Sequence, residues 1–375
     1  MSSARILKEV EIKRSARVLQ LEGMFEVAPA KRSSETWQVD MPIEEREWSI
    51  GAIVGPSGSG KSTIAQEMFP GLVRRGYDDW LADAAVIDGF SKSLGIRDIT
   101  QALSSVGFSS PPAWLRPYRV LSTGQQFRVT VARALTEETP LVVLDEFTSV
   151  VDRTVAQVGS AAVAAAVRRS GRQFVAVTCH EDVIEWLQPD WVYSPVGNRF
   201  TWRLPQRRPD IELVIRRVTA DAWPLFERHH YMNRSLNKAA GCFVAYWRDR
   251  PVAFVGVLAF PHVQAPGWRI SRSVCLPDYQ GVGIGNAFRE YVASLYAATG
   301  RPVHGVSSNP SILAHCNRSP LWRLTRAPSL NSQKRGPDVE KSFKPSIAAR
   351  RLTATFAYCG PVNADDARAF GISLQ

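Results

Sequence analysis

The stretch GPSGSGKST, residues 55–63, stands between a short apolar run, Ile50–Val54, and residues 62–69, which are expected to be helical. Its spacing fits the pattern G-x-x-x-x-G-K-[ST], in which backbone N–H groups and the lysine cradle a triphosphate and the hydroxyl reaches Mg²⁺. The sequence therefore predicts a strand, a phosphate-binding loop and a helix, which together begin an α/β fold. The residues expected to bind the nucleotide here are Gly55, Ser57, Gly58, Gly60, Lys61, Ser62 and Thr63.

Two further apolar runs predict more of the same sheet. Leu141–Leu144 and residues 174–178 are continuously apolar, which is typical of strands buried in a parallel sheet. Residues 153–168 lie between them, are rich in alanine and valine, and are expected to form a crossover helix. An α/β first domain with a mostly parallel sheet follows from this pattern.

Three more segments follow the phosphate loop in order: LSTGQ at residues 121–125, LVVLDE at residues 141–146, and a histidine, His180, just after an apolar run. Together with the loop, this series resembles the ATP-binding cassette (ABC) ATPases. The resemblance implies ATP and Mg²⁺ as cofactors and ATP hydrolysis as the reaction.

The resemblance also assigns roles to single residues. Lys61 would contact the β- and γ-phosphates, and Ser62 and Asp145 would hold Mg²⁺. By the family pattern Glu146 polarises the attacking water and His180 senses the γ-phosphate. Glu146 and His180 are therefore the expected catalytic residues of this domain.

The LSTGQ segment implies a dimer. In ABC ATPases it opens a helix whose positive N-terminal end faces the γ-phosphate bound by the other subunit. Ser122, Gly124 and Gln125 are the matching residues here, so the resemblance implies a homodimer formed through the ATPase domains. Thr123 replaces the usual second glycine of this motif.

Two departures bear on the class of ABC ATPase. The interval from Lys61 to Leu121 is shorter than in transporter cassettes, which indicates a trimmed helical arm. The glutamine that ends the second strand in the family is also not evident. Residues 84–90 place Asp88 near that position, and Gln101 comes late. These features favour a soluble ABC ATPase of the DNA-repair and chromosome-organising type over a transporter subunit.

A composition shift predicts where the first domain ends. Residues 1–202 are expected to form the ABC-type domain, residues 203–210 (RLPQRRPD) a basic linker, and residues 211–375 a second domain. Residues 329–351 have few apolar side chains and a basic excess, so a mobile loop is expected there. The strands expected in the second domain are residues 211–218, 241–247, 252–260, 269–276, 302–307, 322–326 and 352–358, with helices at residues 286–299 and 311–316.

The second domain carries its own glycine loop, Q-x-x-G-x-G at residues 280–285, between a strand and a helix. With the strand order, this resembles the acetyl-coenzyme A loop of the GNAT superfamily of N-acetyltransferases over residues 211–327. The resemblance implies an α+β acyltransferase fold, acetyl-CoA as donor and an amine as acceptor. The residues expected to hold acetyl-CoA are Gln280, Gly281, Gly283 and Gly285.

The general base of such a transferase is not evident, since no glutamate ends the third or fourth strand. His230, Tyr231 and Cys316 are the expected catalytic residues, and by the resemblance either His315 or Cys316 lies near the family's thiolate-protonating position. The other candidates are His229, Ser271, Arg272 and His315. The pattern H-Y-x-x-R at residues 230–234 also resembles the phage DNA-modification protein Mom, although a capped helix end is the plainer interpretation.

Composition bounds the partners and the compartment. Lys and Arg number 46 against 35 Asp and Glu, a net charge of +11, which fits either an anionic partner such as DNA or RNA or a merely basic surface. Five dispersed cysteines indicate reduced thiols. With no signal peptide or membrane-spanning apolar run of about 20 residues, a cytoplasmic protein is expected.

The sequence thus predicts a bifunctional protein in which an ABC-type ATPase is coupled to acyl transfer, possible acceptors being amines on nucleic acid. One alternative is an ATP-dependent nucleic-acid clamp or regulator whose second domain is not catalytic. A third is the ATPase subunit of an ABC transporter, which would need a separate membrane subunit.

Overall fold

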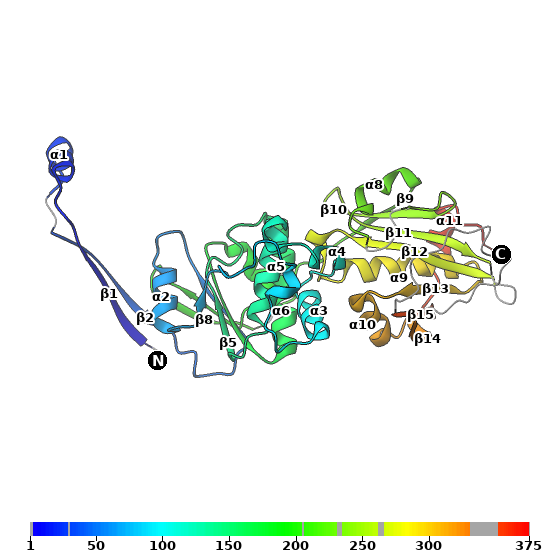
Figure 1. Cartoon of the computed structure of the whole chain (residues 1–375), viewed down its shortest axis with the longest axis horizontal. Coiled ribbons are helices and arrows are strands. Elements are labelled where there is room, and N and C mark those ends of the chain that lie inside the picture. The colour runs from blue at the N-terminus through cyan, green and yellow to red at the C-terminus, as the bar shows by residue number, and fades with distance from the viewer. Residues whose placement is uncertain are drawn as a thin grey trace. The chain divides into compact units, whose positions relative to one another are not determined.

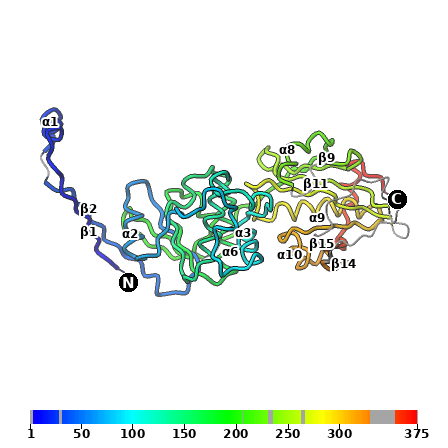
Figure 2. Tube along the Cα trace, viewed as in Figure 1, coloured from blue at the N-terminus to red at the C-terminus, as the bar shows by residue number. Residues whose placement is uncertain are grey.

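A computed structural model of the chain describes residues 3–28, 31–204, 206–230, 235–261, 266–330 and 352–374. The chain divides into two compact units, each assembled from several segments. Figures 1 and 2 trace the chain by residue number from the N-terminus to the C-terminus. Unit 1 comprises Met1–Asp78, Glu137–Val151 and Ala164–Arg208, and unit 2 comprises Asp79–Thr136, Asp152–Val163 and Pro209–Gln375. Tyr231 and most of the predicted basic loop lie outside the described residues. The boundaries at residues 202 and 210 stay predictions.

Unit 1 is built on a six-stranded sheet of order β4-β5-β6-β3-β7-β8, in which only β7 and β8 pair antiparallel. All five residues of β3 are buried, as their unbroken apolar sequence predicts. The elements are β3 (Ile50–Val54), α2 (Lys61–Met68), β4 (Val73–Arg74), β5 (Leu141–Leu144), α6 (Arg153–Ser170, which runs on from unit 2), β6 (Gln173–Thr178), η3 (Glu181–Val183), α7 (Ile184–Leu187), β7 (Trp191–Ser194) and β8 (Arg199–Trp202).

A long hairpin precedes this sheet. β1 (Ser3–Glu11) pairs antiparallel with β2 (Arg32–Asp40) along its whole length, and α1 (Ala16–Phe25) lies between them at the far end (Figure 1). Ile6 and Val39 enter the core of unit 1, whereas α1 has no buried residue. The amino-acid sequence does not predict this hairpin, because its strands are largely polar and exposed and so show no clear alternation.

Unit 2 contains a seven-stranded sheet of order β14-β15-β13-β12-β11-β10-β9, antiparallel except between β12 and β13. The turn between β10 and β11 is the pair Arg248 and Asp249, with φ of 50° and 59°, as in a two-residue primed hairpin turn. The elements are β9 (Val214–Val218), η4 (Ala220–Ala222), α8 (Pro224–Glu227), β10 (Gly241–Trp247), β11 (Arg250–Phe260), β12 (Gly267–Cys275), η5 (Pro277–Tyr279), α9 (Ile284–Ala297), β13 (Val303–Ser307), α10 (Pro310–Arg318), β14 (Trp322–Leu330), β15 (Leu352–Tyr358) and α11 (Ala364–Ala369).

A helical segment belongs to the same unit. It comprises η1 (Val86–Gly89), α3 (Ile96–Ser105), α4 (Pro111–Trp114), η2 (Tyr118–Val120) and α5 (Thr123–Ala134). The predicted second strand at residues 84–90 is wrong, because these residues form the turn of η1, where the N–H of Asp88 bonds the carbonyl of Ala85. The edge strand that pairs with β5 is instead β4. Its two residues are too few to show any hydrophobic period.

The remaining predicted strands and helices are present in the described residues, with ends displaced by up to a few residues, and the α/β class with mixed sheets is confirmed.

Candidate functional site

The carboxyl ends of β3, β5 and β6 meet at one edge of the unit 1 sheet, because these neighbouring strands are parallel. The phosphate loop follows β3, Asp145 follows β5, and His180 lies just beyond β6. This edge is where open α/β sheets bind ligands. The structure thus brings together the candidate residues that the sequence placed far apart.

The phosphate loop has a backbone that requires its glycines. Gly58 and Gly60 have φ of 80° and 87°, in the left-handed region that favours glycine. A Cβ on Gly60 would lie 2.4 Å from Nε1 of Trp37, so this indole fills the space beside the loop. Lys61 opens α2, and its Nζ donates to the carbonyl oxygen of Pro56 at 2.7 Å. The lysine therefore lies back across the loop.

One residue of the loop was missed by the sequence analysis. The hydroxyl oxygen of Ser59 is buried and has no hydrogen-bond partner among the described residues. Ser57 and Gly58 are exposed, and Ser62 and Thr63 are half-buried at the start of α2. A buried hydroxyl without a partner inside a phosphate loop fits a ligand that supplies oxygen acceptors.

The two residues expected to hold Mg²⁺ are in contact. The hydroxyl of Ser62 donates to Oδ1 of Asp145 at 3.1 Å, and the backbone N–H of Glu146 donates to the same oxygen at 2.9 Å. Asp145 is 3% exposed. A hydroxyl and a carboxylate are the hard oxygen ligands that Mg²⁺ prefers, so this donor set fits the metal.

An arginine that the sequence analysis did not single out completes the surroundings of Asp145. Nε of Arg75 donates to Oδ2 of Asp145 at 2.8 Å, and this hydrogen bond, more than the attraction of the two charges, raises the pKa of Arg75. Arg75 directly follows β4, at the carboxyl end of that strand. Asp88 and Gln101 lie elsewhere, in η1 and α3 of unit 2.

Glu146 and His180 stand on neighbouring strand ends. Glu146 is exposed and adopts φ of 55°, and Thr148 adopts φ of 66°, each of which costs about 1 kcal/mol or more in a non-glycine residue. Nδ1 of His180 lies 3.4 Å from Oγ1 of Thr148. The strained turn after Asp145 therefore presents the Glu146 carboxylate to solvent and reaches the histidine through Thr148.

The LSTGQ segment has a clear structural role in unit 2. Ser122 caps α5, and a reciprocal capping box joins the Ser122 hydroxyl to the N–H of Gln125 and the Gln125 side chain to the N–H of Ser122. Gly124 is buried, and a Cβ there would lie 2.9 Å from Val155. Ser122 and Gln125 thus fix the start of this helix, whatever else they bind.

Further along α5, Arg128 is a buried charge that the sequence analysis overlooked. It is 1% exposed and donates to the carbonyl oxygens of Val106, Gly107, Asp278 and Gln280 at 2.9 to 3.2 Å. Burial lowers the pKa of its guanidinium to about 10. Within unit 2, this one side chain joins α5 to the segment that begins the second glycine loop.

The second glycine loop divides into two parts. The Gln280 side chain is fully engaged with other parts of the chain. Its Oε1 accepts from the N–H of Ser109 at 2.9 Å, and its Nε2 donates to the carbonyl oxygen of Cys275 at 2.8 Å. Gly281 is packed so closely that a Cβ would lie 2.7 Å from Ala162 and 2.8 Å from Gly107.

Gly283 differs, because a Cβ there would meet nothing within 4 Å. Gly283 has φ of 92° and precedes α9, whereas Gly285 lies against Cys275. Of the four predicted cofactor residues, Gly283 therefore has open space beside it.

The strands beside this loop diverge. β12 and β13 pair over Trp268 to Ile270 only, although β12 continues to Cys275 and β13 to Ser307. Ser271 and Arg272 begin the part of β12 that pairs with β11 but no longer with β13. Their side chains donate to the carbonyl oxygens of Gly256 and Ser235, respectively.

The other candidate transferase residues fall in two clusters. His230 is 7% exposed with its ring against Trp223, and burial lowers the pKa of the neighbouring His229. Cys316 is 1% exposed and accepts from both terminal nitrogens of Arg289 at 3.3 Å. Burial raises the pKa of the Cys316 thiol, with Arg289 opposing. His315 bonds Glu290 at 2.7 Å.

Two kinds of feature are absent from the part of the chain that the structure describes. No group of three or more His, Cys, Asp or Glu side chains is arranged to hold a metal ion. Within the same residues, no helix has the length and apolar character needed to cross a membrane.

Comparison with known proteins gives similarities to ATP-binding proteins over part of the chain. No protein-family model matches. The sequence is 27% identical over 150 residues to the mycobactin import ATP-binding/permease protein IrtA of Mycolicibacterium thermoresistibile, covering 30% of this chain but only 16% of that protein.

Two solved structures are also similar. One is cbiO1 from Clostridium perfringens, part of an ABC transporter complex, with 19% identity, a TM-score of 0.33, and coverage of 43% of this chain and 76% of that one. The other is a dimeric ATP-binding cassette bound to ADP and Pi, with 15% identity, a TM-score of 0.35, and coverage of 45% and 92%. The sequence-based preference for a DNA-repair type over a transporter type finds no support among these proteins.

Proposed function

We propose that the chain binds ATP and hydrolyses it as an ABC-type ATPase. The observation that carries this proposal is the 3.1 Å contact between the Ser62 hydroxyl and Asp145, which joins the end of the phosphate loop to the end of the neighbouring apolar strand. Lys61 and Glu146 flank this pair in sequence, and His180 lies beyond the next strand. Ser62 and Asp145 would hold Mg²⁺, which supplies charge neutralisation at the phosphates when bound.

In this proposal Lys61 exchanges the Pro56 carbonyl for phosphate oxygens, which are stronger acceptors. Glu146 takes the proton of the water that attacks the γ-phosphorus, while the bond to the bridging oxygen breaks and ADP and phosphate leave. His180 positions the γ-phosphate. Ser122 and Gly124 at the start of α5 would face the nucleotide of a second copy, so hydrolysis requires a homodimer.

Separate measurements of binding and turnover test this proposal. We expect Lys61→Ala to abolish binding of a fluorescent ATP analogue, and Glu146→Gln to bind it while losing turnover by about 10²-fold or more. Asp98→Asn, on α3 of unit 2, is a control that should change neither measurement. Full turnover by both Lys61→Ala and Glu146→Gln would refute the assignment.

A transport role is the better supported use of this ATPase, because the relative with 27% identity is an import ATP-binding/permease protein. The chain would then act with separate membrane subunits. Cross-linking in native cells, followed by mass spectrometry of the purified chain, should identify an integral membrane partner. Recovery of the chain with soluble partners alone would count against transport.

A second candidate activity, acyl transfer from acetyl-CoA by the domain that follows residue 210, is favoured by the divergence of β12 and β13 beside the start of α9. The α9 N-terminus would take the pyrophosphate beside Gly283, since Gln280 and Gly281 are engaged in packing and Gly285 lies against Cys275. An amine nitrogen attacks the thioester carbonyl, the C–S bond breaks, and the thiolate takes up a proton to give an amide and free coenzyme A.

Matched glycine variants test the acyl-donor site. We expect Gly283→Glu to abolish acetyl-CoA binding measured by calorimetry, because the new carboxylate repels the pyrophosphate. Gly300→Glu is the control, since Gly300 also has positive φ and open space but follows the other end of α9. If Gly283→Glu and Gly300→Glu bound acetyl-CoA equally well, the proposed acyl-transfer activity would be refuted. A gel-shift titration over salt with DNA and RNA tests whether the acceptor is a nucleic acid.

A further inference from the structure

The place of Arg75 in the fold follows from strand pairing. β4 runs parallel to β5 with Val73 opposite Val143 and Arg74 opposite Leu144. The N–H of Asp145 then bonds the carbonyl of Arg74 at 2.7 Å. Arg75 and Asp145 are the next residues along the two strands, so strand pairing places their backbones side by side.

The carboxylate of Asp145 has donors on both oxygens. Oδ1 accepts from Ser62 and from the N–H of Glu146, and Oδ2 accepts from Nε of Arg75 at 2.8 Å. The Asp145 side chain is 2% exposed, whereas that of Arg75 is 64% exposed. A buried carboxylate is thus neutralised by a cation that stands in solvent and is free to swing away.

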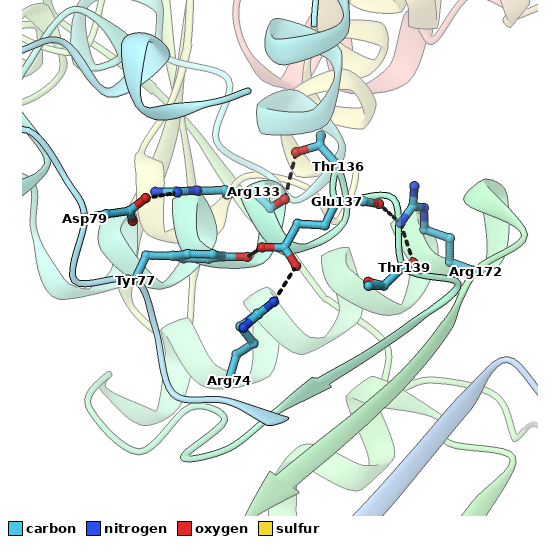
Figure 3. Close-up of polar contacts among 8 residues, drawn as sticks. All are labelled: Arg74, Tyr77, Asp79, Arg133, Thr136, Glu137, Thr139 and Arg172. Atoms are coloured by element: carbon cyan, nitrogen blue, oxygen red, sulfur yellow. Dashed lines mark hydrogen bonds and ion pairs between the residues drawn. The ribbon is translucent and has the colours of Figure 1, made fainter. Parts of the chain in front are cut away.

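Two residues close to Arg75 in the sequence, Arg74 and Tyr77, both contact the carboxylate of Glu137 (Figure 3). Tyr77 donates from its hydroxyl to Oε1 of Glu137 at 2.5 Å, and Arg74 donates to Oε2 of the same carboxylate at 3.4 Å. Arg172 bonds the carbonyl of Thr139 at 2.8 Å, which fixes the segment leading into β5. The backbone at residue 75 is therefore anchored, and the freedom lies in the Arg75 side chain.

We propose that Arg75 is a built-in counter-ion that competes with the divalent cation for Asp145 and so sets how strongly nucleotide binding depends on Mg²⁺. The inference rests on the proposed ATPase function. A guanidinium at hydrogen-bond distance from a metal-binding carboxylate must be displaced, or must share that carboxylate with a second positive charge. Either event lowers the affinity of the site for the metal, and a displaced Arg75 becomes a donor for phosphate oxygens.

The test measures binding of a fluorescent ATP analogue to the full chain while Mg²⁺ is titrated. We expect Arg75→Ala to reach half-saturation at an Mg²⁺ concentration lower by about fivefold or more, the effect of losing one charge-assisted hydrogen bond. Arg75→Lys keeps the positive charge and should stay near the wild type. Arg32→Ala is the matched control, because Arg32 is similarly exposed and pairs with Glu9 at 3.1 Å, away from Asp145.

A double variant makes the test specific to the pair. Asp145→Asn removes the carboxylate, so adding Arg75→Ala to it should produce no further change in the Mg²⁺ requirement. An unchanged or higher Mg²⁺ requirement in Arg75→Ala, with analogue binding intact, would overturn the inference. Failure of the wild type to bind the analogue at any Mg²⁺ concentration would instead overturn the proposed ATPase function.

Discussion

Replacing Arg128 by methionine should destabilise unit 2 strongly. Methionine keeps the apolar stem and much of the volume, so the main loss is the guanidinium. The four carbonyl oxygens that Arg128 now satisfies belong to Val106, Gly107, Asp278 and Gln280. In the variant these oxygens lose their donor in a region that admits little water.

The magnitude follows from two opposing effects. Charge-assisted hydrogen bonds contribute about 2 kcal/mol each, and four are lost. Burial of the guanidinium, which lowers its pKa to about 10, costs about 3 kcal/mol, and the variant recovers that cost. A net loss of about 5 kcal/mol remains, at the upper end of the range measured when one partner of a buried charged contact is removed. This is a large part of the stability of a typical domain.

Hydrogen exchange read by mass spectrometry is the assay, because it reports on the contact as well as on stability. Protection should fall in peptides covering residues 104–109 and 276–285, whose contacts include the bond from Ser109 to Gln280. Arg119→Met is the control, since Arg119 forms an exposed pair with Asp83 and should contribute less than about 1 kcal/mol. Equal protection in the two variants would refute the assigned role of Arg128.

Three further outcomes are expected. In urea unfolding, Gly281→Ala should destabilise the protein by about 2 kcal/mol or more, because its Cβ would lie 2.7 Å from a neighbouring side chain. Gly283→Ala, also at positive φ but in open space, should lower the stability by about 1 kcal/mol. Equal losses of stability in the two variants would contradict this packing. Native-state labelling with iodoacetamide at pH 8 should modify exposed Cys179 rapidly and Cys316 slowly, since burial shields Cys316 and raises its thiol pKa. Burial lowers the pKa of His229 in the folded protein, so the unfolded chain binds a proton at this residue more readily. The melting temperature should therefore fall as the pH drops from about 7.5 to 5.5. In His229→Asn the melting temperature should fall less over the same range.

The sequence by itself determined the continuous apolar strands and the motif residues. Ile50–Val54 and Leu141–Leu144 are strands with the predicted bounds, because an unbroken apolar run between polar ends can be satisfied only by burial on both faces of a sheet. The phosphate loop was equally evident, since its glycines and lysine follow from local backbone geometry and charge. The second glycine loop was visible for the same reason as a turn between a strand and a helix, whereas its acetyl-CoA type stays a prediction.

Tertiary structure alone decided which of those residues are free to act. β4 is too short to show a period, so Arg75 could not be placed beside Asp145 before its strand was paired with β5. Gln280 and Gly281 look in sequence like the other residues of their loop, but packing from a distant part of the chain engages them and leaves Gly283 open. In the sequence Arg128 cannot be distinguished from an exposed arginine on a helix, and only the tertiary structure shows that it is buried. Local sequence records propensity and chemistry, whereas burial and partner choice depend on contacts between residues far apart in the chain.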